Sequence, residues 1–180
     1  MDWKQQLEDE CLRIEEDAIL SMKTMFNERD ALRRRHDLFT GVRLTLGGLS
    51  GGGVLYQSKV AYQSRSVKPW VLGGAALMQL FAFGLEVTSQ IYSEKADVCH
   101  NIASEYDSLC STTRFYRVNE LARDESVESA TAHVKELMNM RLDINKRRPS
   151  LWDRGSWKRA QYGASTGESI HEVDKKHSEG

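Results

Sequence analysis

Apolar residues in both charged flanks of the chain recur at helical spacing. In residues 2–36, which contain neither glycine nor proline, they fall every three or four positions and would form one stripe along a helix. This first stripe comprises Leu7, Cys11, Ile14, Ala18, Met22 and Met25. A second stripe comprises Cys99, Ile102, Tyr106 and Leu109, and a third lies within residues 127–144. The spacing predicts an amphipathic helix over residues 1–37 and a helical region over residues 93–160, with no sheet.

The second stripe suits two arrangements. A polar segment at residues 123–126 separates it from the third stripe, and Ser126 is expected to cap a helix that begins at Val127. Such a turn favours an intramolecular antiparallel bundle, in which the stripes cover one another. The same stripe could instead form a seam with a partner protein or with a second copy of the chain, because helices also associate through such stripes. Cys99, Ile102, Tyr106 and Leu109 are therefore candidate partner-binding residues.

Two apolar segments occupy the middle of the chain, at residues 38–57 and 70–92. Each is about twenty residues long, which at ~1.5 Å per residue is enough to cross ~30 Å of hydrocarbon. The residues between them, 58–69, are polar and predict a linker. These lengths favour a two-helix transmembrane hairpin, flanked by long cytoplasmic helices that form a helical bundle. The alternative is a soluble all-α bundle in which the same two helices are buried.

Glycines in the first apolar segment favour the membrane alternative. In the interior of a helix each glycine costs ~1 kcal/mol relative to alanine. In a membrane, two glycines four residues apart instead let a second helix approach closely. Two such pairs overlap here, Gly47 with Gly51 and Gly48 with Gly52. We expect these four residues to form a helix-packing surface in an assembled pore.

Each apolar segment also contains a charged residue. Arg43 lies near one end of the first segment, and Glu86 lies in the second. Because an ionisable residue within a membrane is costly, it is a functional candidate by default. Glu86 could line a pore or pair with Arg43, or it could simply face the lipid headgroups near the end of its helix.

Composition and motifs indicate neither an enzyme nor a metal protein. The 25 Lys and Arg residues nearly balance the 26 Asp and Glu residues, so no overall charge favours direct nucleic-acid binding. The three cysteines form no C-x-x-C pair, and we predict no cofactor, metal or catalytic residue. The G-x-S-x-G pattern at residues 48–52 lies within a helix-length apolar run, whereas a nucleophile elbow needs a strand, a turn and a helix.

The flanks also predict an orientation in the membrane. Three arginines at residues 33–35 directly precede the first apolar segment, and basic residues are enriched on the cytoplasmic side. Two spans place both termini on one side, so we predict cytoplasmic termini and a bacterial inner membrane. Residues 161–180 are polar, and we expect a disordered tail.

The order of these elements has a known counterpart. Residues 29–160 contain a basic helix end, a glycine-rich span, a short linker, a second span and a long helix. Residues 96–109, with His100 and Tyr106-x-x-Leu109, and residues 140–149, followed by Trp157-Lys158-Arg159, carry most of the similarity. In this order and in these motifs the chain resembles the SLATT family, the SMODS- and SLOG-associating two-transmembrane effector domains of bacteria. The chain departs from the family pattern in its more polar first span and in the residues after Pro149.

The resemblance implies a membrane effector of a bacterial antiviral defence system that acts by abortive infection. Such a protein would oligomerise and form a pore, or disrupt the inner membrane, when a partner senses infection. The partners implied are the lipid bilayer, further copies of the chain, and a sensor protein or an enzyme that makes a nucleotide second messenger. Two alternatives are a phage-type holin or other membrane-lysis protein, and a soluble helical adaptor.

Overall fold

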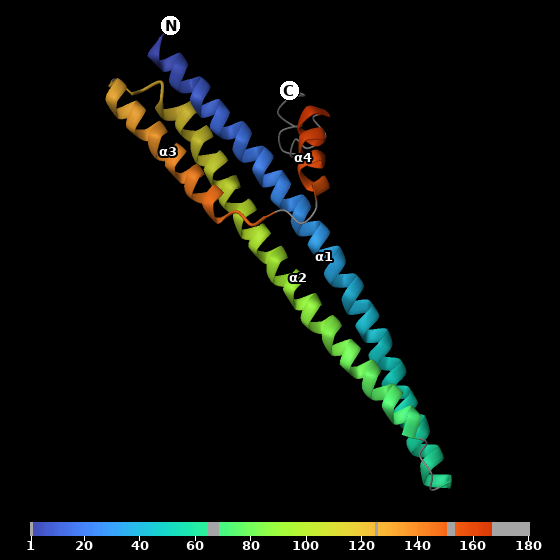
Figure 1. Ribbon diagram of the computed structural model, residues 1–180. Coiled ribbons are helices and arrows are strands. Elements are labelled where there is room, and N and C mark those ends of the chain that lie inside the picture. Colours follow the sequence, from blue (N-terminus) through green and yellow to red (C-terminus); the bar gives the residue numbers. More distant parts are fainter. Residues whose placement is uncertain (1, 65–68, 125, 151–153, 167–180) are drawn as a thin grey trace. The chain divides into compact units, whose positions relative to one another are not determined.

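A computed structural model of the chain (Figure 1) contains only helices in the part that it describes. The described backbone covers residues 2–64, 69–124, 126–150 and 154–166, and the side chains at 50–72, 75, 154, 157 and 163–166 lie outside the description. The helices are α1 (Trp3–Ser64), α2 (Pro69–Phe115), α3 (Val127–Arg147) and α4 (Arg154–Thr166). A π-helical segment, Tyr116–Glu120, directly follows α2. The all-α class predicted from the periodicity is confirmed.

Three of the predicted boundaries differ from the structure. The first helix does not end near residue 37, because α1 continues through the first apolar segment to Ser64. The predicted linker at residues 58–69 is therefore helical over most of its length, and Pro69 begins α2, where the missing N–H of proline costs nothing. The disordered tail predicted for residues 161–180 overlaps α4, which extends to Thr166. Residues 167–180 lie outside the described part of the chain.

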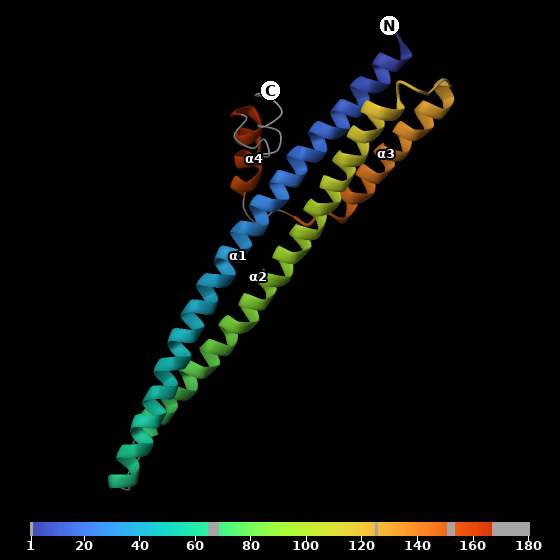
Figure 2. The ribbon, with the colours of Figure 1, turned by 180° about the vertical axis from the view of Figure 1, so that it is seen from behind.

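The chain divides into two compact units. The described residues of Met1–Asp30 and Asp97–Gly180 form one unit, which we call the bundle. Those of Ala31–Ala96 form the other, which we call the hairpin. Within the bundle, the two views in Figures 1 and 2 show the first part of α1, the last part of α2 and all of α3 lying side by side. The bundle is thus built from two segments that the hairpin separates in sequence.

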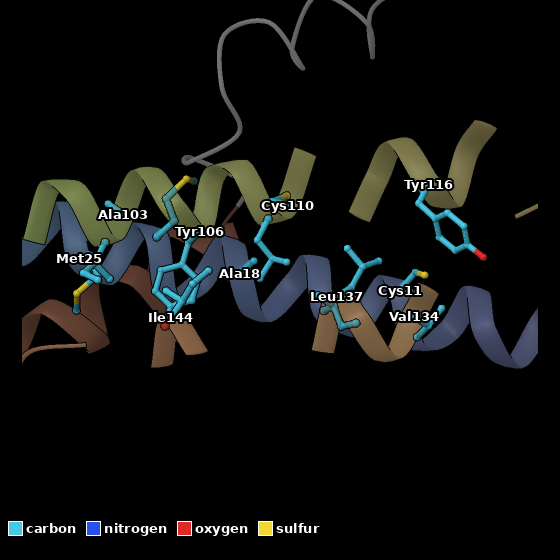
Figure 3. Packing of buried hydrophobic residues seen from close by; sticks show 14 of the residues in the cluster. Cys11, Ala18, Met25, Ala103, Tyr106, Cys110, Tyr116, Val134, Leu137 and Ile144 are labelled. Atoms are coloured by element: carbon cyan, nitrogen blue, oxygen red, sulfur yellow. The ribbon is translucent and has the colours of Figure 1, made fainter. Parts of the chain in front are cut away.

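The core of the bundle is made by the three apolar stripes. Its central side chains come from α1, α2 and α3, as Figure 3 shows. The largest of them, Tyr106, is fully buried and donates its hydroxyl hydrogen bond to the side-chain oxygen of Asn145 on α3. Residues of the core include Cys11, Ile14, Ala18, Met22, Met25, Ile102, Leu109, Val134, Leu137 and Ile144.

The second stripe is therefore not a seam for a partner. Cys99, Ile102, Tyr106 and Leu109 are all buried within the chain itself. The prediction that they bind a partner is wrong for this structure, and the intramolecular alternative is the correct one. The physical reason is that the first and third stripes already cover the second, so no apolar surface is left on it for another protein.

The predicted turn before α3 is confirmed. Ser126 is the N-cap of α3, and its side-chain oxygen accepts a hydrogen bond from the backbone N–H of Ser129 at 3.4 Å. This bond satisfies one of the N–H groups that the first turn of any helix leaves without a partner. Two further bonds tighten the turn, from the backbone N–H groups of Arg123 and Asp124 to the carbonyl of Glu120, at 2.8 and 3.1 Å.

The π-helical segment adjusts the register at the end of α2. The backbone N–H of Leu121 donates to the carbonyl of Tyr116 at 2.9 Å, a bond across five residues. An α-helix would turn residues five apart onto different faces, whereas here both Tyr116 and Leu121 are buried. The Tyr116 ring stacks on His133 with 4.1 Å between centroids, and its hydroxyl donates to Asp124 at 2.8 Å. Burial, together with Asp124, raises the pKa of Tyr116.

The hairpin consists of the remaining parts of α1 and α2. The two run antiparallel, because Phe39 and Arg43 of α1 contact Tyr92 and Glu86 of α2, in reverse order along the chain. Within the described residues, no helix presents an apolar stretch of the length that a membrane crossing requires.

Candidate functional site

The described part of the hairpin exposes most of its large apolar side chains. Eleven of them leave between 42% and 69% of their surface uncovered within the chain. They are Leu38, Val42, Leu44 and Leu49 on α1, and Leu77, Met78, Leu80, Phe81, Phe83, Val87 and Ile91 on α2. Large exposed apolar patches are typical of surfaces that contact lipid or another protein, so these side chains are candidates for such a contact.

Small and polar side chains lie between the two helices instead. Arg43 on α1 pairs with Glu86 on α2, with 2.6 Å between Nη1 and Oε1. One turn away, the hydroxyl oxygens of Thr40 and Ser89 are 3.0 Å apart and share a hydrogen bond. Ala82 and Ser89 are buried at this contact. The hairpin thus differs from the usual arrangement, since most of its large apolar side chains face outward and one of its ion pairs lies at the helix–helix contact.

An aromatic pair supports the same contact. The rings of Phe39 and Tyr92 stack with 5.5 Å between their centroids and only 3° between their planes. The three cross-links join residues of α1 in rising order to residues of α2 in falling order, as an antiparallel pair requires. Of the roles predicted for Glu86, pairing with Arg43 is the one that the structure contains.

A groove of about 330 Å³ opens beside the ion pair. It is lined by Arg43, Leu44, Gly47, Gly48, Gln79, Ala82, Phe83 and Glu86. The ion pair is only partly buried, with 31% of the Arg43 side chain and 43% of the Glu86 side chain exposed. Two opposite charges, a polar amide and two glycines therefore share one open concave surface on the hairpin.

The glycines on this surface have open space where a side chain would begin. A Cβ atom added at Gly47 or at Gly48 would meet nothing within 4 Å. The fold of the single chain therefore does not need glycine at either position. Gly51 and Gly52 continue α1, but their surroundings lie outside the described residues, so the predicted second half of each glycine pair stays a prediction.

A second charged cluster lies in the bundle. Glu15 is almost fully buried, and its carboxylate accepts hydrogen bonds from Arg117 at 2.7 and 3.2 Å and from Arg114 at 3.5 Å. The hydrogen bonds to Glu15 raise the pKa of Arg117. Sequence analysis missed this pair, although Glu15 lies four residues after Cys11 and three before Ala18, in the spacing of the first stripe.

A third polar contact holds α4 against α1 within the bundle. Ser156 is fully buried, and its hydroxyl donates to Oε2 of Glu28 at 2.8 Å. The side-chain amide of Asn27 donates to the backbone carbonyl of Ser156 at 3.4 Å. Glu28 is itself buried, so α4 supplies a hydrogen-bond donor to a buried carboxylate of α1.

Two of the buried cysteines are poor candidates for nucleophiles. Burial raises the pKa of Cys11 and of Cys99 to about 11, which keeps both thiols protonated and poorly nucleophilic at neutral pH. Among the described residues, no group of three or more metal-ligating side chains is close enough to hold an ion. The groove on the hairpin, where charges meet an apolar surface, is the candidate functional site.

Comparisons with protein-family models, with curated proteins and with solved structures gave no match for this chain.

Proposed function

We propose that this chain is a membrane effector of a bacterial antiviral defence system, whose hairpin spans the inner membrane. The effector oligomerises and forms a pore, or otherwise disrupts the membrane, when a partner senses infection. One observation carries the proposal: the hairpin directs most of its large apolar side chains outward and holds Arg43 and Glu86 between its helices. In lipid the outward side chains match their surroundings, and charged residues are expected to face the interior of a helix assembly.

The composition of the bundle supports a two-span topology. The bundle is built from residues on both sides of the hairpin, so both ends of the hairpin must lie on the same side of the membrane. An even number of crossings meets this requirement, and the hairpin has two helices. The arginines at residues 33–35 favour the cytoplasm as that side.

The defence role is supported by the resemblance of residues 29–160 to SLATT effectors, with the bilayer, further copies and an infection sensor or nucleotide-second-messenger enzyme as partners. Gene neighbourhood tests this part of the proposal. A neighbouring nucleotide cyclase, reverse transcriptase or nucleotide sensor is the expected finding, whereas neighbouring lysis genes would identify a holin.

We expect the chain to stay in the membrane pellet when bacterial membranes are extracted with alkaline carbonate. Changing Leu77 and Leu80, both strongly exposed on the hairpin, to arginine is expected to move the protein out of the pellet. Each such change costs roughly 3–4 kcal/mol of insertion free energy near the centre of a span. Leu142→Arg, at an exposed position of the bundle, is the matched control and should leave the pellet fraction unchanged. Recovery of the unmodified chain in the supernatant would identify a soluble adaptor instead.

We expect Gly48→Leu to remain in the membrane but to lose assembly. A Cβ atom at position 48 meets nothing within 4 Å, so we expect the hairpin to keep its fold, and leucine makes the first span more apolar. The same side chain blocks the close approach of a neighbouring helix. The expected result is a normal pellet fraction, loss of the crosslinked ladder and loss of toxicity on overexpression.

Gly41→Leu provides the control for this experiment. Gly41 is equally open, but it lies outside the two overlapping glycine pairs, so its ladder and toxicity should match those of the unmodified chain. A normal ladder and full toxicity in both Gly47→Leu and Gly48→Leu would remove the glycine surface from the mechanism.

A further inference from the structure

We infer that the groove beside Arg43 and Glu86 faces the aqueous lumen of the assembled pore, and that these two side chains determine which ions pass. This inference rests on the proposed pore, whose lining would then include Arg43 and Glu86. It names small inorganic ions of either sign as the conducted species.

The ion pair between Arg43 and Glu86 is partly exposed. Nη1 of Arg43 and Oε1 of Glu86 are 2.6 Å apart, yet about a third of one side chain and more than two fifths of the other are uncovered. Charged groups exposed to hydrocarbon are costly, so in a membrane the open side of this pair needs water or protein against it. Lipid is therefore a poor occupant of the groove.

The groove has the size and the polar lining to hold water. A space of about 330 Å³ holds roughly ten water molecules. Gln79 adds an amide to the two charges along the same surface. The apolar side chains of the hairpin, such as Leu77 and Leu80, are exposed to contact lipid. A hairpin with one polar concave surface and many exposed apolar side chains has the two kinds of surface that a pore subunit needs.

Two glycines also line the groove. Gly47 and Gly48 present no side chain, so a neighbouring copy can approach the hairpin beside the groove without covering the charges. A ring of copies would then bring one positive and one negative charge per subunit to the lumen. Rings of charged side chains set the selectivity of pores, and two rings of opposite sign at similar depth nearly cancel.

The test is the permeability ratio of K⁺ to Cl⁻ for the full chain, reconstituted in planar bilayers of phosphatidylethanolamine and phosphatidylglycerol under a KCl gradient. The unmodified pore should select weakly. Arg43→Gln leaves a negative ring and should raise the ratio severalfold, whereas Glu86→Gln leaves a positive ring and should lower it severalfold. The exchange of both charges, Arg43→Glu with Glu86→Arg, keeps the pair and should restore weak selectivity.

Two controls keep the outcomes distinct. Arg34→Gln and Glu94→Gln remove exposed charges outside the predicted spans and should leave the ratio unchanged. Conducting pores whose ratio is the same in both single variants would show that the groove is covered by dry protein contact, which overturns the inference and leaves the proposed pore intact. Absence of conductance from the unmodified chain, inserted in the bilayer with or without its sensor partner, would overturn the pore and the inference together.

Discussion

Replacing Leu109 with alanine is expected to lower the free energy of unfolding of the bundle by about 2–5 kcal/mol. Leu109 has no exposed surface and lies in the core between α1, α2 and α3. Truncating it removes the burial of its methyl groups and leaves a cavity that close-packed neighbours fill only in part. This loss would be a large fraction of the stability of an ordinary domain.

The three cysteines offer a way to measure this loss in the full chain. Cys11, Cys99 and Cys110 are all buried in the bundle, so each thiol reacts with an uncharged alkylating reagent only when the bundle opens. A loss of about 2 kcal/mol corresponds to a roughly thirtyfold faster reaction. Leu142→Ala is the control, because 55% of Leu142 is exposed, and its reaction rate should change little. Unchanged thiol rates in Leu109→Ala would contradict the core assignment.

Removing the negative charge of Glu15 is expected to have the second large effect. Only 6% of the Glu15 side chain and 19% of the Arg117 side chain are exposed, so Glu15→Gln leaves a mostly buried guanidinium with only the more distant, half-exposed carboxylate of Glu8, at 3.8 Å, as a counter-charge. Breaking a buried ion pair in this way costs about 3–5 kcal/mol. Replacing both residues with methionine removes both charges and should recover most of that loss.

An exposed ion pair on the same helix is the matched control. Glu10 and Arg13 also approach to 2.7 Å, but 36% and 70% of their side chains are exposed. Surface pairs of this kind contribute about 0–1 kcal/mol, so Glu10→Gln should change stability little. The alkylation rate of Cys99 reports both variants. Equal rates in Glu15→Gln and Glu10→Gln would show that burial does not strengthen the Glu15 pair.

Local signals in the sequence predicted the local parts of this structure. Ser126 caps α3 as expected, because a cap depends only on the residue and on the N–H groups just after it. The helices follow from apolar spacing in the same way. Pairing with Arg43 was among the roles predicted for Glu86, because two opposite charges in two apolar segments stabilise each other when they meet.

The features that the sequence did not predict depend on contacts between distant residues. A stripe such as Cys99 to Leu109 looks the same whether its own chain or another chain covers it, so periodicity could not decide between core and seam. The bond across five residues at Tyr116 likewise has no local signature, because it follows from the need to bury both Tyr116 and Leu121. The linker was predicted to begin at residue 58, whereas α1 continues to Ser64. Residues 54–64 contain no glycine or proline that would stop the helix.

The split arrangement of the bundle has a consequence for the biosynthesis of this protein. Residues up to Asp30 leave the ribosome first, but the residues that cover them begin at Asp97. At ~5–20 residues per second, the first helix waits roughly 3–13 s for its partners, while the whole hairpin is translated. With the hairpin inserted as proposed, the two segments meet only if both of its helices have crossed. Closure of the bundle then acts as a proofreading step, and chains with a single crossing are left with an open, protease-sensitive first helix.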